Sequence, residues 1–447
     1  MTQKFVLTFL CILFLPPIII HGAGINMNVN QSAEWCKTLN RLASIEPDAT
    51  YYNPAGTAFL GQGVYMYLSD QIIYQPIRIE TKQSAAAGLS RNSYPGEKNS
   101  WYLLNGYLLV KYRRLALSGA GLGFGSGGNV VFNNGLQELD ILSGGPYGPG
   151  AAVNSLFART GLAGPIGRPA IPFSKFSGIF TIYAVQANAA YEVVPGRLSL
   201  SLGFRFYLGE ATYDAKLLMP GPGAAYGGYI PRGSDLHAHQ QGISAGIVAG
   251  LCSMPMKGLV IGISGEWNSP FRLDTKSHDD LMFTLIDYRF KNNRKIDAQL
   301  PASVGMGVSY RFAGARVSAS FAYSFNQFAQ MKGRERGYAG GIDAGIGFDY
   351  TIEPILLNIG AGYLYSTTGA RPSARSQRDD GLDSHSASLG ASMYIGAGMT
   401  LTVAEVYTYY VPANVNRGQN NVLRLFPAVI QRQSFNTAIG LTSKFWF

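Results

Sequence analysis

Few residues of this chain have the types and spacing that chemistry at a site requires. His237 and His239 alternate along a predicted strand, so both side chains lie on one face and offer two ligands for a metal ion. No third ligand stands at a fixed spacing from them. We therefore predict no metal site.

Hydrolysis of a lipid needs a serine and a histidine in contact. Ser384, His385 and Ser386 are the one local candidate, but neighbouring residues of a strand point to opposite faces. We predict no catalytic residue and no cofactor. Cys36 and Cys252 lie far apart, outside any metal-type spacing, and both a disulfide and two thiols remain open.

A run of alternating glycines, Gly119, Gly121, Gly123 and Gly125, superficially suggests a nucleotide-binding loop. That interpretation fails, because the strand before and the helix after it are missing. Within a strand, such a run strips one face of side chains. The run therefore predicts either a local bend or the close approach of another backbone.

The composition is compatible with a membrane β-barrel. The chain has 447 residues, of which only 14% are charged, with 55 Gly, 27 Tyr and 24 Phe. After the first twenty or so positions no apolar run reaches eighteen residues, which argues against membrane helices. In a barrel, lipid-facing residues alternate with polar ones, consistent with a mean hydropathy of +0.06.

Residues 1–24 have the pattern of a signal peptide: Lys4, an apolar stretch from Phe5 to Ile20, and small residues at 22–24. A transmembrane anchor is disfavoured, because the stretch is short and contains Pro16 and Pro17. Export follows from this prediction.

After Gly61 the hydropathy alternates with a period of two. Short turns alternate with long connections, as in outer-membrane barrels, and the strands are long enough to cross a bilayer. We predict an all-β, membrane-spanning antiparallel barrel of about 14 strands over residues 62–447. The predicted strands span 62–80, 98–112, 115–125, 179–194, 198–213, 236–250, 259–272, 296–311, 316–327, 338–352, 355–366, 384–395, 399–410 and 431–447.

Residues 25–61 do not alternate. Glu34 to Leu42 fits a short helix, and Pro47 interrupts the chain after it. The corner Asn53, Pro54, Ala55 and Gly56 then leads to the first strand. About forty residues bury too little for a core of their own, so this segment is predicted to pack inside or beneath the barrel as a plug.

The formal charge of +10 does not indicate nucleic-acid binding, because Lys and Arg form no basic helix. Many arginines fall in the long connections, where they either contact lipopolysaccharide phosphates or are simply solvated. These are Arg159, Arg168, Arg232, Arg371, Arg375, Arg378 and Arg417.

The longest predicted connection, 125–178, carries scattered apolar residues, and Asn134 to Leu142 fits a short amphipathic helix. Such residues must be buried, either against one another or against a hydrophobic ligand. The residues in question are Leu136, Leu139, Ile141, Leu142, Leu156 and Phe157.

Two stretches carry a resemblance to a known family. Arg-Leu-Ala-Ser-Ile-Glu-Pro-Asp-Ala-Thr-Tyr-Tyr (41–52), followed by Asn53 to Gly56 and a long strand, resembles the hatch of the FadL/TodX outer-membrane transporters. The last strand places Phe435, Ile439 and Phe445 on one face. It ends at Phe447, which resembles the terminal aromatic signal read by the barrel assembly machinery. Trp35 and Cys36 depart from the family pattern, so ligand-contacting residues are not carried over.

The resemblance implies passive uptake of hydrophobic small molecules, such as long-chain fatty acids, across the outer membrane of a Gram-negative bacterium by a monomer. It also implies release by movement of the plug about Asn53 to Ala55, a lateral opening at the glycine run 119–125, and a surface groove for ligand in 125–178. The competing functions are a structural or adhesive barrel and a lipid hydrolase.

Overall fold

The computed structural model describes residues 28–29, 31–81, 91–137, 139–140, 173–219, 232–279, 291–331, 333–375, 377, 381–415 and 427–445. Several predicted features lie outside these residues. They are the signal peptide 1–24, Phe447, the groove residues Ile141, Leu142, Leu156 and Phe157, and the arginines Arg159, Arg168, Arg378 and Arg417.

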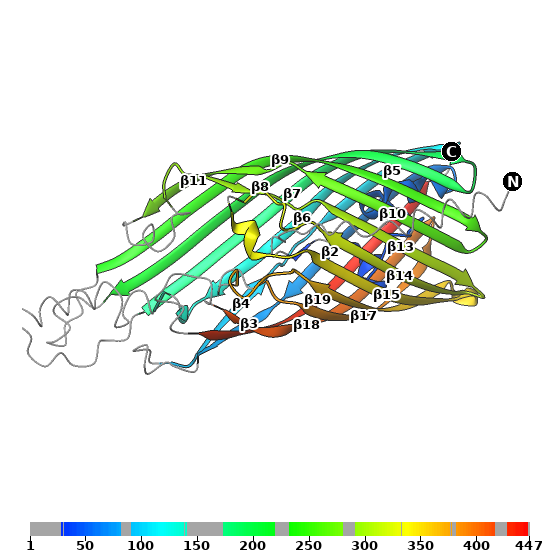
Figure 1. Ribbon diagram of the computed structural model, residues 1–447. Helices are drawn as coiled ribbons and strands as arrows, with labels where there is room; N and C mark the ends of the chain where they lie inside the picture. Colours follow the sequence, from blue (N-terminus) through cyan, green and yellow to red (C-terminus); the bar gives the residue numbers. More distant parts are fainter. Residues whose placement is uncertain are drawn as a thin grey trace, which may run out of the picture.

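The described chain forms one antiparallel β-barrel, whose strands run obliquely around the bore (Figure 1). Its strands are β2 (Gly63–Tyr74), β3 (Pro76–Thr81), β4 (Ser93–Asn99), β5 (Asn105–Tyr112), β6 (Leu115–Phe132), β7 (Phe173–Val194), β8 (Leu198–Met219), β9 (Arg232–Met256), β10 (Leu259–Asn268), β11 (Phe271–Asp279), β12 (Lys295–Ala298), β13 (Ser303–Phe312), β14 (Ala315–Ser324), β15 (Gly341–Ile352), β16 (Leu357–Thr367), β17 (Ser384–Gly396), β18 (Met399–Val415) and β19 (Ala428–Phe445). Two short 3-10 turns, η4 (Arg334–Gly337) and η5 (Glu353–Ile355), lie between strands.

These segments make fourteen crossings, because β2 with β3, β4 with β5, β10 with β11, and β12 with β13 are each one interrupted crossing. The barrel closes where β19 pairs with β2 and β3. Among the described strands, closure pairs the last strand with the first, so no free edge strand is left, as a sheet in hydrocarbon requires. The predicted fold class is confirmed.

The period-two alternation predicted from the sequence sets the two faces of the wall. On β8, Leu200, Leu202, Phe204 and Phe206 point outward and are 46–64% exposed. Arg205, which lies between two of them, points inward and is buried. The barrel therefore has an apolar outer surface and a largely polar bore. No helix among the described residues is long and apolar enough to cross a membrane.

The strands on one side of the barrel extend further than predicted. β6 continues to Phe132 and β7 begins at Phe173, so the predicted connection 125–178 is shortened at both ends. β8 and β9 pair in register from Leu198↔Ser253 out to Met219↔Arg232. Glycines and polar residues obscure the alternation of apolar and polar residues in these extensions. The strand lengths predicted from that alternation are therefore too short.

The N-terminal segment lies inside the bore, at the end where the short turns are found (Figure 1, blue). It contains β1 (Asn28–Val29), α2 (Ala33–Thr38), α3 (Ala49–Tyr52) and the 3-10 helix η1 (Pro54–Phe59). The predicted helix over 34–42 is shorter than expected, because Leu39 adopts a left-handed conformation (φ 56°) and ends α2.

Candidate functional site

The corner that joins the plug to the barrel is held by backbone contacts. Pro54 begins η1, where its missing N–H costs nothing. The amide of Asn53 donates to Leu42 O (3.1 Å) within the plug and to Leu251 O (3.0 Å) on β9. A β-carbon on Gly56 would lie 1.9 Å from Ser44 O, so only glycine fits there. The corner is therefore fixed to the wall as well as to the plug.

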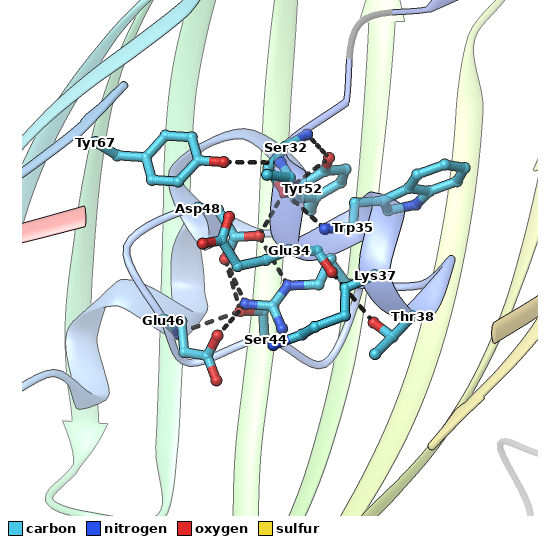
Figure 2. Close-up of polar contacts among 12 residues, drawn as sticks. Ser32, Glu34, Trp35, Lys37, Thr38, Ser44, Glu46, Asp48, Tyr52 and Tyr67 are labelled. Atoms are coloured by element: carbon cyan, nitrogen blue, oxygen red, sulfur yellow. Dashed lines mark hydrogen bonds and ion pairs between the residues drawn. The ribbon is translucent and has the colours of Figure 1, made fainter. Parts of the chain in front are cut away.

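A buried ion pair organises the plug internally. Arg41 makes a two-pronged contact with Asp48, from Nε to Oδ2 and from Nη2 to Oδ1, both at 2.7 Å. Ser32 Oγ also donates to Asp48 Oδ2 (2.8 Å) and accepts from Trp35 N, which caps α2. Figure 2 shows this network joining α2 to the segment before α3. The plug is thus a single unit, although it is too small for an apolar core.

Charged groups tie the plug to one side of the wall. Arg316 on β14 donates to Glu46 (2.7 Å), which also accepts from Arg41. Lys37 donates to Asn358 and Ser392, both at 2.6 Å. Burial alone would raise the pKa of Glu46, but the charges of Arg41 and Arg316 outweigh it and hold that pKa well below its ordinary value. Glu46 is therefore ionised at neutral pH, and the plug is bound electrostatically to β14–β17.

Glycines of the barrel wall let the plug backbone come close. A β-carbon on Gly262 of β10 would lie 2.0 Å from Leu42 O. On Gly347 and Gly362 it would lie 2.5 and 2.4 Å from Thr38 O. No side chain fits in these spaces, so the plug and these strands are complementary in shape.

A cavity of about 430 Å³ lies in the bore against the plug. Its plug side includes Trp35, Leu39, Leu42, Tyr51 and Tyr52, and its other walls come from β2, from β8 to β10 and from β13 to β19. This volume is in the range of small-molecule sites.

Arg205 lies beside this cavity and joins β8 to the plug. Its side chain is 2% exposed and donates to Glu266 (2.8 Å) and Gln186 (2.8 Å). Its guanidinium also lies 5.0 Å from the ring centroid of Tyr51 in the plug. Nothing in the local sequence around Arg205 identifies this contact, because Glu266 is 61 residues away.

The predicted glycine run divides into two pairs. Gly119 and Gly121 are on the lipid-facing side, and a β-carbon on Gly121 would meet nothing within 4 Å. Gly123 N donates to Leu104 O (2.8 Å), and Gly125 pairs with Val29 of β1. The register with β7 shifts between Leu122 and Gly125. Close backbone approach therefore occurs only at Gly123 and Gly125.

The wall beside this run is interrupted. Residues 100–104 separate β4 from β5, and Trp101, Tyr102 and Leu104 in this segment are 52–78% exposed. Beyond the interruption, β6 changes partner from β5 to β4. An interrupted stretch of wall therefore lies between the second and third crossings, beside the strand where the lateral opening is expected. The opening itself remains a proposal.

Two of the predicted groove residues are packed inside the barrel. Leu136 and Leu139 are 0% and 4% exposed, in an apolar cluster with Phe132, Tyr94 and Ile430. Asp140 N donates to Leu136 O (3.0 Å), consistent with the predicted helical turn. For these two residues the structure shows burial against neighbouring protein side chains. The groove as a whole remains a prediction.

The structure does not bring together the residues that were considered for catalysis or for metal binding. Ser384 and Ser386 face the bore, whereas His385 points outward, with its Nδ1 2.7 Å from Tyr363 OH. His237 and His239 contact different carboxylates, of Asp214 and Glu210 respectively. The described residues contain no cluster of three metal-type ligands. Cys36 and Cys252 are both buried and free.

The fold and the site together define a membrane-spanning β-barrel stoppered by its own N-terminal segment. The chain is similar to a solved Pseudomonas aeruginosa FadL homologue, at 15% identity and TM-score 0.65, over 95% of this chain and 100% of that one. It is also similar to the Ralstonia pickettii toluene transporter TbuX (13%, TM-score 0.58, 94% and 100%). A third similar structure is the P. putida toluene transporter TodX (12%, TM-score 0.55, 90% and 95%).

No family model matches the sequence. No curated protein matches it either. The similarity is thus one of fold, and the fold is that of the FadL/TodX-type transporters, as predicted.

Proposed function

We propose that this protein carries hydrophobic small molecules passively across the outer membrane of a Gram-negative bacterium. The observation that carries the proposal is a cavity of about 430 Å³ whose floor is a plug bound to the wall by glycine contacts and by charges. Such a floor stops free flow but is a separate piece of chain that can move. The similar solved structures include two toluene transporters.

Labelled uptake tests the proposal. Cells with the protein are expected to take up labelled toluene or oleate faster than cells without it, with no dependence on an energy source. Deletion of residues 25–61 should abolish selective uptake or make the barrel leaky, whereas a structural or adhesive barrel would keep its surface binding. Equal uptake with and without the protein would contradict transport.

We further propose lateral exit at the third crossing. Its support is the interruption at 100–104 beside Gly123, where Gly123 N donates a backbone hydrogen bond to Leu104 O. A Leu104→Cys, Gly123→Cys pair should form a disulfide that blocks uptake until a reductant is added. The matched control is Leu108→Cys with Gly119→Cys, register partners nearer the short turns of the same strands. Unchanged uptake with the first pair oxidised would exclude this exit.

Cys36 and Cys252 are both buried and need no replacement in this experiment. Contact of lipopolysaccharide with the arginines of the long connections, recognition by the assembly machinery, and a monomeric state also remain proposals. Hydrolysis of phospholipid is not expected, because Ser384 and Ser386 lie on the opposite face of β17 from His385.

A further inference from the structure

The wall of the cavity opposite the plug is rich in hydroxyl groups. Serines line the cavity from several of the strands between β13 and β19, namely Ser303, Ser320, Ser366, Ser384, Ser386 and Ser434. The plug contributes aromatic rings from Trp35, Tyr51 and Tyr52. The cavity is therefore two-sided, with hydrogen-bonding groups facing aromatic ones.

The positive charges that line this cavity are already neutralised. Arg41 is 2% exposed and is held by Asp48 and Glu46. Arg205 is equally buried and is held by Glu266. Neither guanidinium is free to bind the carboxylate of a solute, because each already contacts a carboxylate of the protein.

One acidic side chain in the cavity wall has no ion-pair partner among the described residues, unlike the two arginines. Asp343 on β15 lines the cavity and is exposed to it, whereas Gly345, Gly347 and Asp349 on the same face of the strand are buried. Its cross-strand neighbours are Ala322 on β14 and Ser366 on β16. Asp343 forms no ion pair with any residue that the structure describes.

These observations define which polar group the cavity accepts. A carboxylate ion would meet the like charge of Asp343. Among the described lining residues it would find no guanidinium that is not already paired with a carboxylate. An ammonium group would meet an opposite charge, serine hydroxyls that accept hydrogen bonds, and aromatic faces that attract cations. A hydroxyl group would gain the hydrogen bonds without the charge. The apolar part of the solute would pack against Trp35, Leu39 and Leu42.

We propose that the cavity above the plug is a binding site for small amphipathic amines, with Asp343 as the anchor of the ammonium group. This inference rests on the proposed uptake function and narrows its cargo. Alcohols of the same shape bind there more weakly, and carboxylates are disfavoured. An engineered cavity of about 150 Å³ accommodates benzene, so about 430 Å³ holds a substituted single ring with room to spare.

Three probes that share one ring separate the charge states: 2-phenylethylamine, 2-phenylethanol and phenylacetate. Their binding to the purified full-length protein in detergent is measured by calorimetry at pH 7. We expect the amine to bind at least tenfold more tightly than phenylacetate, with the alcohol between them. Equal affinities for the amine and phenylacetate would overturn the inference.

Asp343→Asn keeps the shape of the side chain and its ability to bond Ser366, and removes only the charge. This variant should lose about tenfold in affinity for the amine, while the affinity for the alcohol stays within about threefold. The matched control is Asp274→Asn, at an exposed aspartate of β11 that lies outside the cavity. Heat-dependent mobility in gel electrophoresis confirms that each variant is a folded barrel. A preference for the amine that persists in Asp343→Asn would show that Asp343 is not the anchor.

Flux into proteoliposomes separates this inference from the proposed function. Transport of toluene or oleate without any preference for the amine leaves the function standing and overturns the amine site. Binding of the amine that depends on Asp343, without transport of any probe, leaves the site standing and overturns the function.

Discussion

Arg316 of barrel strand β14 and Glu46 of the plug form an ion pair, with Nη1 2.7 Å from Oε1, across 270 residues of sequence. The same guanidinium donates from Nε to Asp349 on β15 (2.7 Å), and Glu46 also contacts Arg41 inside the plug. A continuous row of charges therefore runs from two barrel strands into the plug. This row makes the seating of the plug sensitive to single charge changes.

Replacement of Glu46 with Gln should loosen the plug. Arg316 and Arg41, whose side chains are 12% and 2% exposed, would lose a shared counter-charge. Because Glu46 itself is 35% exposed, solvent screens part of this loss, and we expect the plug to be destabilised by about 1 to 2 kcal/mol. Planar-bilayer recordings should show more frequent channel opening. Glu80→Gln on exposed β3 is the control, and identical conductance in Glu46→Gln and wild type would refute the role of this pair.

Close contact of the plug with the wall predicts opposite results for two glycines. In Gly262→Ala the new methyl group would lie 2.0 Å from Leu42 O, so the plug must shift. In Gly121→Ala the methyl group enters open space on the lipid-facing side. We expect channel leakage and a loss of roughly 1 to 3 kcal/mol of plug stability for the first variant only. Conductance and thermal unfolding of both variants measure this difference, and a well-seated plug in Gly262→Ala would contradict it.

The barrel was predictable from sequence because alternation on each strand is local. The alternation from Leu200 to Phe206 is enough to predict which side chains of that strand face outward, without knowledge of any other strand. The plug corner was similarly visible in Asn53, Pro54 and Gly56. Asn53, however, bonds to Leu42 and Leu251, and this tie to the wall is not evident from its own neighbours.

The contacts that fill the bore could not be predicted in the same way. Arg316 meets Glu46, and Arg205 meets Tyr51, only once fourteen crossings have closed in one register. Glycine within a strand ordinarily weakens it, and the role of inward-facing Gly347 and Gly362 depends on the plug backbone that lies opposite them. Asp343 lies on a face that otherwise carries mainly glycines, and its place in the cavity follows from that register.

The geometry of the pair Arg41 and Asp48 predicts that charge alone does not hold the plug together. Lysine at position 41 keeps the positive charge but cannot make both contacts with Asp48. We expect amide hydrogens of residues 33–52 to exchange about tenfold faster in Arg41→Lys, equivalent to roughly 1.4 kcal/mol. Arg272→Lys, at an exposed position on β11, should leave exchange unchanged. Equal protection in Arg41→Lys and wild type would show that the two-pronged contact is dispensable.

Asp140 predicts a pH dependence in the apolar cluster around Leu136. Burial raises the pKa of Asp140 from 3.8 to about 6, although the hydrogen bond from Ser174 and the charge of Arg91 act in the opposite direction. Since the packed form holds the proton more tightly, the stabilisation by this group is complete below pH 3.8. This stabilisation decreases as the pH rises from 3.8 to about 6, and above pH 6 the stability of the cluster no longer changes with the titration of Asp140. The difference between the two pKa values of Asp140, 3.8 and about 6, corresponds to roughly 3 kcal/mol of stability.

Hydrogen exchange of residues 133–140, corrected for intrinsic rates, should therefore show greater protection at pH 5 than at pH 7.5. Asp140→Asn carries no titratable group and should give the same protection at both values, because the amide mimics the protonated acid. Asp235→Asn, at an exposed residue of β9, should behave as wild type. If wild type shows no pH dependence between these values, Asp140 is ionised in the packed cluster throughout, and Ser174 and Arg91 outweigh its burial.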